Sequence, residues 1–334
     1  MPVRTRLYEI DYIRIYLILA LIVCHAFAPF NTWHPICDFN IGAYRYIAKF
    51  AYSAMLETFV FISGFLFYSK LNEGVKIWDL IKSKFTRLLV PCYIFGLLYV
   101  VLCGTISWSS AYSLLNGYGH LWFLPMLFWV FIVYYYAYPY VKKYVVASSI
   151  IIFALAVLPY PGMPMRINNV MYYLAFFHMG VMIRTFDNVK LKMTSLRWIH
   201  ILAVLYIVLF ISGTFIKESY LLVKPEASIL HKAYIGWLSN MSRIVYSIVG
   251  VALFYSIAYN VAQAKKYNVA PVANLCFGVY LFQEIILQLL YYKMNISEYV
   301  SPYISPWIAC VITLTLSLAL VNIMRKSRIL KSMI

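Results

Sequence analysis

Charged side chains are scarce in this sequence of 334 residues. Only 12% of the residues are charged and only 11 are Asp or Glu, whereas 64% are hydrophobic. The mean hydropathy of +0.79 lies well above the value typical of a soluble globular protein. These values exclude a water-soluble enzyme and indicate an integral membrane protein.

The sequence also lacks the cysteine patterns of disulfide-rich and zinc-binding proteins. Its six cysteines form no CxxC pair and no Cys/His cluster, so we interpret them as small buried hydrophobic residues and expect no metal. No small-residue cleavage site follows the first apolar run, which contains Asp11, Arg14 and His25. That run is therefore interpreted as a retained first helix and not as a signal peptide.

Apolar runs bounded by polar residues, Pro or Gly follow one another along the whole chain. They lie at about 10–29, 46–69, 88–108, 120–140, 144–160, 168–184, 198–216, 237–261, 271–292 and 305–324. We therefore predict an all-α, polytopic transmembrane bundle of about ten helices that forms one domain over residues 1–334. An even number of helices returns both termini to the same side, which we predict to be the cytoplasm.

Lys and Arg outnumber Asp and Glu and give a formal net charge of +17. With the N-terminus in the cytoplasm, most of these cations fall in the predicted inner connections, as the positive-inside rule requires. The positive charge therefore mainly reflects the orientation of the protein in the membrane. We expect a multi-pass protein of the bacterial plasma (inner) membrane, in contact with membrane lipids. Because the cations are scattered over several segments, no nucleic-acid partner is expected.

The first helix carries the sharpest functional pattern. Arg14 and His25 are eleven residues apart, so they share one helical face about 16 Å apart along the axis. Asp11 lies one turn before Arg14 and can pair with it. Arginine can hold phosphate oxygens, and a neutral imidazole can act as a general base. Snorkelling of Arg14 and a packing role for His25 are the structural alternatives.

Further polar groups lie in the second helix and in the connection that follows it. A carboxylate such as Glu57 is costly in a membrane unless it is paired or faces a cavity. Ser63 and Gly64 are interpreted as a close-packing contact, because no Gly-x-Ser-x-Gly elbow surrounds them. Lys84 and Arg87, about one turn apart, are placed to meet the phosphates of a donor at the inner face.

His120 and Trp122 open the fourth helix at the predicted outer surface, where either could be an ordinary interfacial residue. His178 is another polar group within a predicted helix. Arg243 and a carboxylate, Glu57 or Glu284, are expected to neutralise each other.

Four blocks in this order resemble the acyltransferase 3 family of integral membrane O-acyltransferases, which includes fucose O-acetylase-like enzymes. The blocks are Asp11-x-x-Arg14 with His25, FVFISGFLF around Ser63, KFTRLLVPCY around Arg87, and HLWFLPMLF at His120. The resemblance implies transfer of an acyl group, typically acetyl, from cytoplasmic acetyl-CoA or another acyl-CoA to a sugar hydroxyl of a cell-surface polysaccharide or lipid-linked glycan.

The resemblance also implies roles for individual residues. Arg14 and His25 become the essential pair of the first helix, and Arg87 with Lys84 becomes part of the acyl-donor site. Members of the family often end a late helix block in Tyr-Leu-x-His, whereas this chain has Gln283 after Tyr280, Leu281 and Phe282. The departure removes a possible second base.

These observations lead to a hypothesis for the reaction. Donor phosphates lie against Arg14, Lys84 and Arg87, and His25 acts as general base while Glu57 orients it or balances its charge. The acceptor sugar is expected to contact His120, Trp122 and Ser63. The alternatives from other classes are a transporter or flippase for a lipid-linked sugar or another anionic substrate, and a non-catalytic partner in polysaccharide export.

Overall fold

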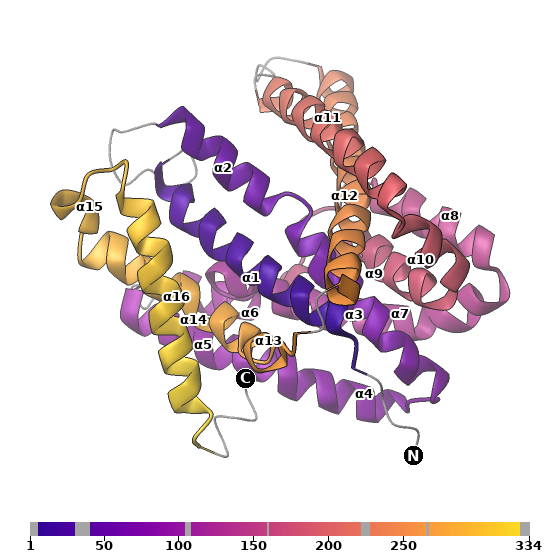
Figure 1. Ribbon diagram of the computed structural model, residues 1–334, viewed down its shortest axis with the longest axis horizontal. Coiled ribbons are helices and arrows are strands. Elements are labelled where there is room, and N and C mark those ends of the chain that lie inside the picture. Colours follow the sequence, from indigo (N-terminus) through magenta and orange to yellow (C-terminus); the bar gives the residue numbers. More distant parts are fainter. Residues whose placement is uncertain are drawn as a thin grey trace.

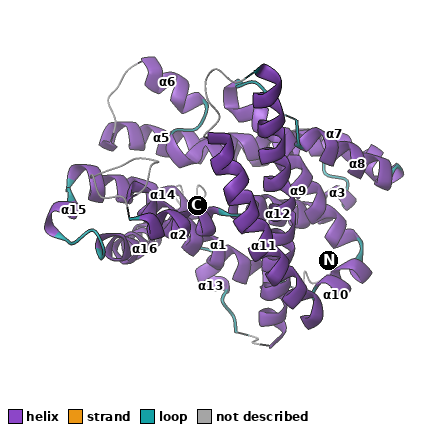
Figure 2. Ribbon diagram, turned by 90° about the horizontal axis from the view of Figure 1, so that it is seen from above, coloured by secondary structure: helices purple, strands orange, loops and turns teal. Residues whose placement is uncertain are grey.

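Every described element of the chain is helical (Figure 1). The computed structural model describes residues 6–30, 41–103, 108–158, 160–221, 228–264 and 267–327. Short connections join the helices, which pack at several different angles to one another (Figure 2). The prediction of an all-α helical membrane protein is confirmed for this part of the chain.

The helices follow the predicted apolar runs, with additional short helices between them. The α-helices are α1 (Tyr8–Phe27), α2 (Gly42–Tyr52), α3 (Met55–Asn72), α4 (Ile77–Lys84), α5 (Val90–Cys103), α6 (Trp108–Leu115), α7 (Phe123–Lys143), α8 (Val145–Ala156), α9 (Val170–Thr185), α10 (Asp187–Met193), α11 (Leu196–Leu221), α12 (Ile229–Ala264), α13 (Ala270–Ala273), α14 (Cys276–Gln288), α15 (Ile296–Tyr299) and α16 (Ser305–Met324). Tighter or wider turns form η1 (Ala28–Phe30), η2 (Phe85–Leu89), η3 (Gly119–Trp122), η4 (Pro164–Asn169) and η5 (Leu289–Lys293).

Two predicted runs are interrupted in the structure. The run predicted over 46–69 is divided into α2 and α3, because Ala54 between them has a left-handed backbone with φ of 55°. The run predicted over 271–292 contains α13, α14 and the π-helical segment η5. Breaks of this kind change which side chains share a face along each run.

Seven helical stretches among the described residues are long and apolar enough to cross a membrane. They are Tyr8–Phe30, Gly42–Asn72, Ile77–Cys103, Gly119–Lys143, Leu196–Ile216, Tyr234–Ala264 and Ser305–Met324. The total of ten crossings and the cytoplasmic position of both termini stay predictions.

Helix α1 runs through the middle of the molecule and packs against α2, α3, α12, α14 and α16 (Figure 1). Helices α3 and α9 make a close crossing beside it. A Cβ atom added to Gly64 would overlap the backbone of Phe177, and one added to Gly180 would overlap the backbone of Phe61. Both glycines therefore allow the two backbones to touch, as small residues do between membrane helices.

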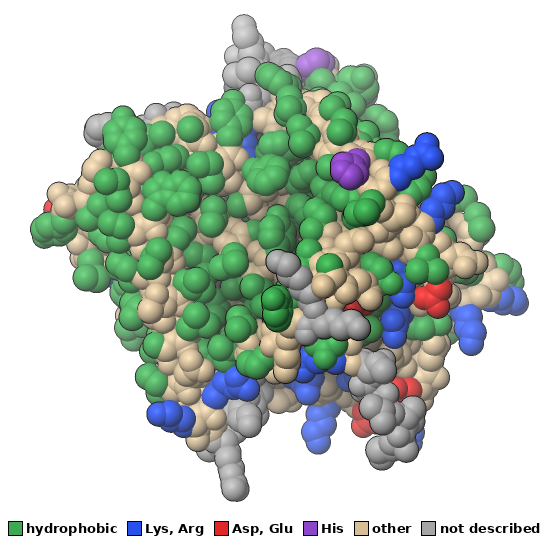
Figure 3. All heavy atoms as spheres, in the orientation of Figure 1, with side chains coloured by type: hydrophobic (Ala, Val, Ile, Leu, Met, Phe, Trp, Pro, Cys, Tyr) green, Lys and Arg blue, Asp and Glu red, His purple; other side chains and the backbone are tan. Residues whose placement is uncertain are grey.

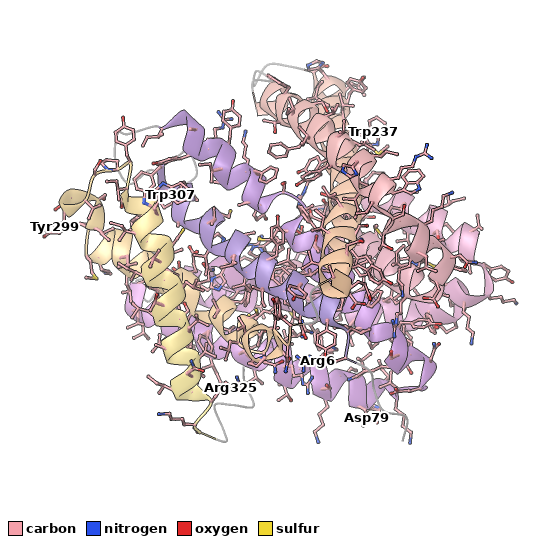
Figure 4. All side chains as sticks on the ribbon, viewed as in Figure 1. Arg6, Asp79, Trp237, Tyr299, Trp307 and Arg325 are labelled. Atoms are coloured by element: carbon pink, nitrogen blue, oxygen red, sulfur yellow. The ribbon has the colours of Figure 1, made fainter. Side chains whose placement is uncertain are left out.

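Charged and aromatic side chains mark two sides of the molecule. Lys and Arg side chains gather along the lower and right edges of the face in Figure 3, whereas most of that face is apolar. Arg6, Asp79 and Arg325 lie toward the lower edge in Figure 4, and Trp237 and Trp307 lie toward the upper edge. We call these the inner and the outer side, after the orientation that the positive-inside rule predicts.

Candidate functional site

The imidazole of His25 and the carboxylate of Glu284 are in direct contact between α1 and α14. His25 Nδ1 lies against Glu284 Oε2, and the side chains are only 16% and 17% exposed. The amide nitrogen of Gln283 lies 3.1 Å from the same Nδ1 atom. Gln288 Nε2 donates to Glu284 Oε1 over 3.2 Å, which fixes the carboxylate from its other side.

This contact determines how His25 can react. An ionised carboxylate only accepts hydrogen bonds, so Nδ1 carries the proton that Glu284 accepts. The other ring nitrogen, Nε2, is then left with a lone pair, and no described residue hydrogen-bonds to it. An amide nitrogen only donates, so a protonated Nδ1 requires the Gln283 amide to be flipped, with its otherwise unpartnered oxygen facing Nδ1. A histidine oriented by a carboxylate in this way is equipped to act as a general base.

His120 lies beside His25, with 6.2 Å between the ring centroids and 75° between the ring planes. Its Nε2 donates to the backbone oxygen of Tyr280 over 2.9 Å, and the Tyr280 hydroxyl donates to the backbone oxygen of His120 over 2.9 Å. Because Nε2 holds the proton, Nδ1 is an acceptor, and it is buried without a partner among the described residues. His120 is therefore a neutral imidazole that is fixed in place by Tyr280.

A cavity of about 790 Å³ opens beside these groups, and we call it the histidine cavity. Its volume lies in the range of small-molecule binding sites. His25, His120 and Glu284 line it together with aromatic side chains from α2, α5, the turn before η3, η3, α14 and η5, among them Tyr52, Tyr99, Tyr118, Trp122, Tyr280 and Tyr291. The predicted site residues His25, His120 and Trp122 therefore meet at one cavity, although they come from elements far apart in the sequence.

A second cavity of about 460 Å³ shares Tyr52 and Trp122 with the first, and we call it the arginine cavity. Its wall also contains Ala156, Leu158, Tyr160, Arg166, Asn168, Asn169, Tyr172, Tyr173, Asn240 and Arg243. Asn240 follows Trp237 by about one turn of α12, so the cavity lies toward the outer side. The shared Tyr52 and Trp122 place the two cavities next to each other.

Glu57 lies behind the wall of the arginine cavity, where it pairs with two wall residues and not with His25. Its Oε1 accepts from Arg243 Nη2 over 3.0 Å and from the Tyr172 hydroxyl over 2.7 Å. The orienting role predicted for Glu57 is therefore wrong in its geometry, because Glu284 occupies the place beside His25. The expected neutralisation of Arg243 by a carboxylate is present, with Glu57 as its partner.

The predicted donor-site cations lie away from the two histidines. Arg14 Nη1 is 3.9 Å from Asp11, whose closer partner is Arg6 at 2.7 Å. The hydrogen bond with Asp11 raises the pKa of the Arg6 guanidinium. Lys84 Nζ lies 3.4 Å from the ring centroid of Phe131, and Arg87 is exposed on the π-helical segment η2. Their role toward a donor stays a prediction.

Ser63 takes no part in either cavity. Its hydroxyl donates to the Phe59 carbonyl oxygen over 2.9 Å, one turn back in α3. The predicted contact of Ser63 with the acceptor has no support from these two cavities and stays a prediction, whereas the close packing predicted at Gly64 is present against α9. The Ser63 hydroxyl is used by its own helix, as is common for serine in membrane helices.

His178 forms a separate buried network. The Tyr134 hydroxyl lies 2.9 Å from Nδ1, and the Ser149 hydroxyl lies 2.8 Å from Nε2. Ser149 also donates to the Val145 carbonyl oxygen over 2.7 Å, so it accepts from Nε2 and Tyr134 donates to Nδ1. Each ring nitrogen is satisfied, and we interpret the network as a connection among α7, α8 and α9.

Glu284 is the residue of this candidate site that the sequence analysis did not single out. It appeared there only as one carboxylate in an apolar helix and as a possible partner of Arg243. The signal that could have drawn attention to it is its position directly after Gln283, where the resemblance implies a histidine near the reaction centre. The contact between α14 and α1 depends on tertiary packing, and a single sequence does not reveal which helices pack together.

Comparison with known proteins gives one match. A family model described as an acyltransferase domain matches residues 7–322, which include both cavities. Neither the curated proteins nor the solved structures contain a match to this chain.

Proposed function

Because the chain belongs to the acyltransferase domain family, we propose that it transfers an acyl group, acetyl in the first instance, from acyl-CoA to a saccharide hydroxyl. The contact between His25 and Glu284 carries this proposal, because it leaves Nε2 of His25 as a base at the wall of a ligand-sized cavity. The family and the apolar helices make the protein an integral membrane acyltransferase.

The proposed reaction is a direct acyl transfer. His25 Nε2 takes the proton of the acceptor hydroxyl while that oxygen attacks the carbonyl carbon of the thioester. The carbon–sulfur bond then breaks, and the departing CoA sulfur takes the proton from His25. Glu284 stabilises the imidazolium that exists between these two proton transfers. A thioester is already activated, so no covalent acyl-enzyme is required.

The residues around His25 are proposed to orient the acceptor and the reacting carbonyl group. His120 lines the cavity beside His25 and is held by its two hydrogen bonds with Tyr280, so it forms a fixed part of the wall against which the acceptor lies. Tyr99 and Tyr118, with ring centroids 4.8 Å apart, are the phenolic donors in the cavity wall that can stabilise the developing oxyanion. Trp122 offers an aromatic face between the two cavities.

The donor is proposed to enter from the inner side. Arg14, Lys84 and Arg87 are the cations proposed to hold its phosphates, and Arg14 lies about 16 Å from His25 along α1. The pantetheine arm would extend from there toward the histidine cavity. The bacterial plasma membrane is the proposed location, with a cell-surface polysaccharide or a lipid-linked glycan as the acceptor on the outer side.

The test is a transfer assay with the purified full-length protein in lipid nanodiscs. Radiolabelled acetyl-CoA and a surface-glycan extract are supplied, and CoA release and labelled glycan are measured. His25→Ala should lower transfer by about 10² to 10⁴-fold. His200→Ala is the matched control, because His200 is an exposed histidine of α11 outside both cavities. Folded wild-type protein that moves a lipid-linked sugar across the bilayer without releasing CoA would instead identify a transporter.

A further inference from the structure

The arginine cavity has a composition that the reaction at His25 does not explain. Two arginines line it, and its wall contains no Asp or Glu among the described residues. Three asparagines and several aromatic rings complete the wall, and Tyr52 and Trp122 also border the histidine cavity. A molecule seated there would be directly beside the proposed reacting centre.

We propose that the arginine cavity binds a glycosyl unit that carries a negative charge, such as a uronic acid, with Arg166 recognising the anionic group. The proposal rests on the proposed acyl transfer to a saccharide and names the chemical class of that saccharide. It concerns the glycosyl unit that enters the arginine cavity while a hydroxyl of the same acceptor reaches His25.

The charge balance of the cavity identifies Arg166 as the recognising residue. Arg243 is neutralised by Glu57 at 3.0 Å and also lies over the ring of Tyr172 at 4.4 Å. Arg166 has no carboxylate partner among the described residues, and its guanidinium lies 5.9 Å from the ring centroid of Trp122. The cavity therefore keeps one uncompensated positive charge at its exposed edge, and a planar guanidinium can bind a carboxylate through two hydrogen bonds.

Aromatic and amide side chains suit the remainder of a sugar ring. Trp122 and Tyr173 lie with ring centroids 6.1 Å apart, and their apolar faces can cover the apolar face of a pyranose. Asn169 and Asn240 are half-buried in the wall, and each amide offers both a donor and an acceptor to hydroxyl groups. Asn169 Oδ1 also accepts from Asn168 Nδ2 over 3.0 Å, which leaves the Asn169 amide nitrogen to donate to a ligand hydroxyl.

The backbone around Arg166 is held in an unusual conformation. Met165 and Arg166 have φ values of 54° and 57°, in the left-handed region that side-chain-bearing residues seldom adopt. The Met165 amide donates to the Asn116 side chain over 2.8 Å, which ties this segment to the approach to η3. This strained backbone places Arg166 beside Trp122, at the junction of the two cavities.

The test measures binding to the full-length protein in phosphatidylcholine nanodiscs, without acyl-CoA. The ligands are matched pairs, methyl glucuronide with methyl glucoside and methyl galacturonide with methyl galactoside. For at least one pair we expect the acidic sugar to bind about tenfold more tightly than the neutral sugar. Arg166→Gln should remove this difference. Arg45→Gln, the same change on α2 outside both cavities, should preserve it.

Equal affinity within every pair would overturn the proposal, and so would a preference that persists in Arg166→Gln. Loss of saccharide binding when phosphatidylglycerol replaces phosphatidylcholine would also overturn it, because the cavity would then hold an anionic lipid headgroup. Since the binding assay contains no donor, failure of acyl transfer leaves the binding result intact. Failure of binding likewise leaves the result with His25→Ala intact, so the two proposals fail separately.

Discussion

His120 and Tyr280 hydrogen-bond to each other's backbone carbonyl oxygens, each over 2.9 Å. The imidazole donates in one direction and the phenol donates in the other, so η3 and α14 are fixed together at the wall of the histidine cavity. This pair leaves Nδ1 of His120 as the free acceptor. It also holds η3, which directly precedes α7, against the helix that carries Glu284.

Tyr280→Phe removes one of these two hydrogen bonds without changing the ring. We expect the free energy of unfolding to fall by about 1 kcal/mol. The KM for the acceptor should rise several-fold, because His120 is less firmly oriented. Tyr44→Phe is the control, since Tyr44 also donates to a backbone oxygen, at 2.6 Å, outside both cavities. The control should lose similar stability with unchanged kinetics, and an unchanged KM in Tyr280→Phe would contradict the positioning role.

Glu57 and Arg243 should behave as a coupled pair in a double-mutant cycle. Glu57→Gln leaves a partly exposed cation without its partner, so we expect a loss of about 2 kcal/mol in the free energy of unfolding. The double variant with Arg243→Gln should be more stable than the sum of the single losses predicts, because neither charge is left alone. Thermal unfolding of the four proteins measures this, and strictly additive losses would show that the pair is not coupled.

Ser63 and Gly64 should differ sharply on substitution. Gly64→Ala should lower the free energy of unfolding by about 1–3 kcal/mol, because the new methyl group meets the Phe177 backbone. Ser63→Ala should change it by less than about 0.5 kcal/mol, since its hydroxyl bonds only to its own helix. Thermal unfolding and acyl transfer are measured for both. A large loss of transfer in stable Ser63→Ala would support the acceptor role predicted for this residue.

The network at His178 should serve stability alone. His178→Phe keeps an aromatic ring but leaves the Tyr134 hydroxyl without its acceptor, so we expect a loss of about 1–3 kcal/mol. The KM for acceptor and donor should stay the same in the protein that remains folded. A change in either KM at full folding would connect this network with the substrate sites.

The sequence predicted where helices lie better than where they bend. Hydrophobic runs identify segments that must satisfy their own backbone hydrogen bonds, and these runs are helical in the structure. The break at Ala54 carries no comparable signal, because alanine is a strong helix former and its left-handed backbone depends on tertiary packing. The shift to π-helical bonding in η5 is likewise a local change without a Pro or Gly to mark it.

The candidate site was predicted only in part, because tertiary packing also decides which side chains meet. Helical spacing selected His25 for its position on one face with Arg14, and the structure has both residues on one continuous helix and His25 at the wall of a cavity. Spacing within a helix cannot show which of two distant carboxylates reaches that histidine. Glu57 is in α3 and Glu284 is in α14, and only the packing of α1 against α14 places Glu284 beside it.

Steady-state kinetics of His25→Ala, Glu284→Gln and the double variant test the central relationship most directly. If Glu284 acts only through His25, Glu284→Gln should lower kcat by at least about tenfold, and adding it to His25→Ala should cause no further loss. Folding of each protein is checked by thermal unfolding. Independent, multiplicative losses in the double variant, or wild-type kcat in Glu284→Gln, would contradict a catalytic unit formed by His25 and Glu284.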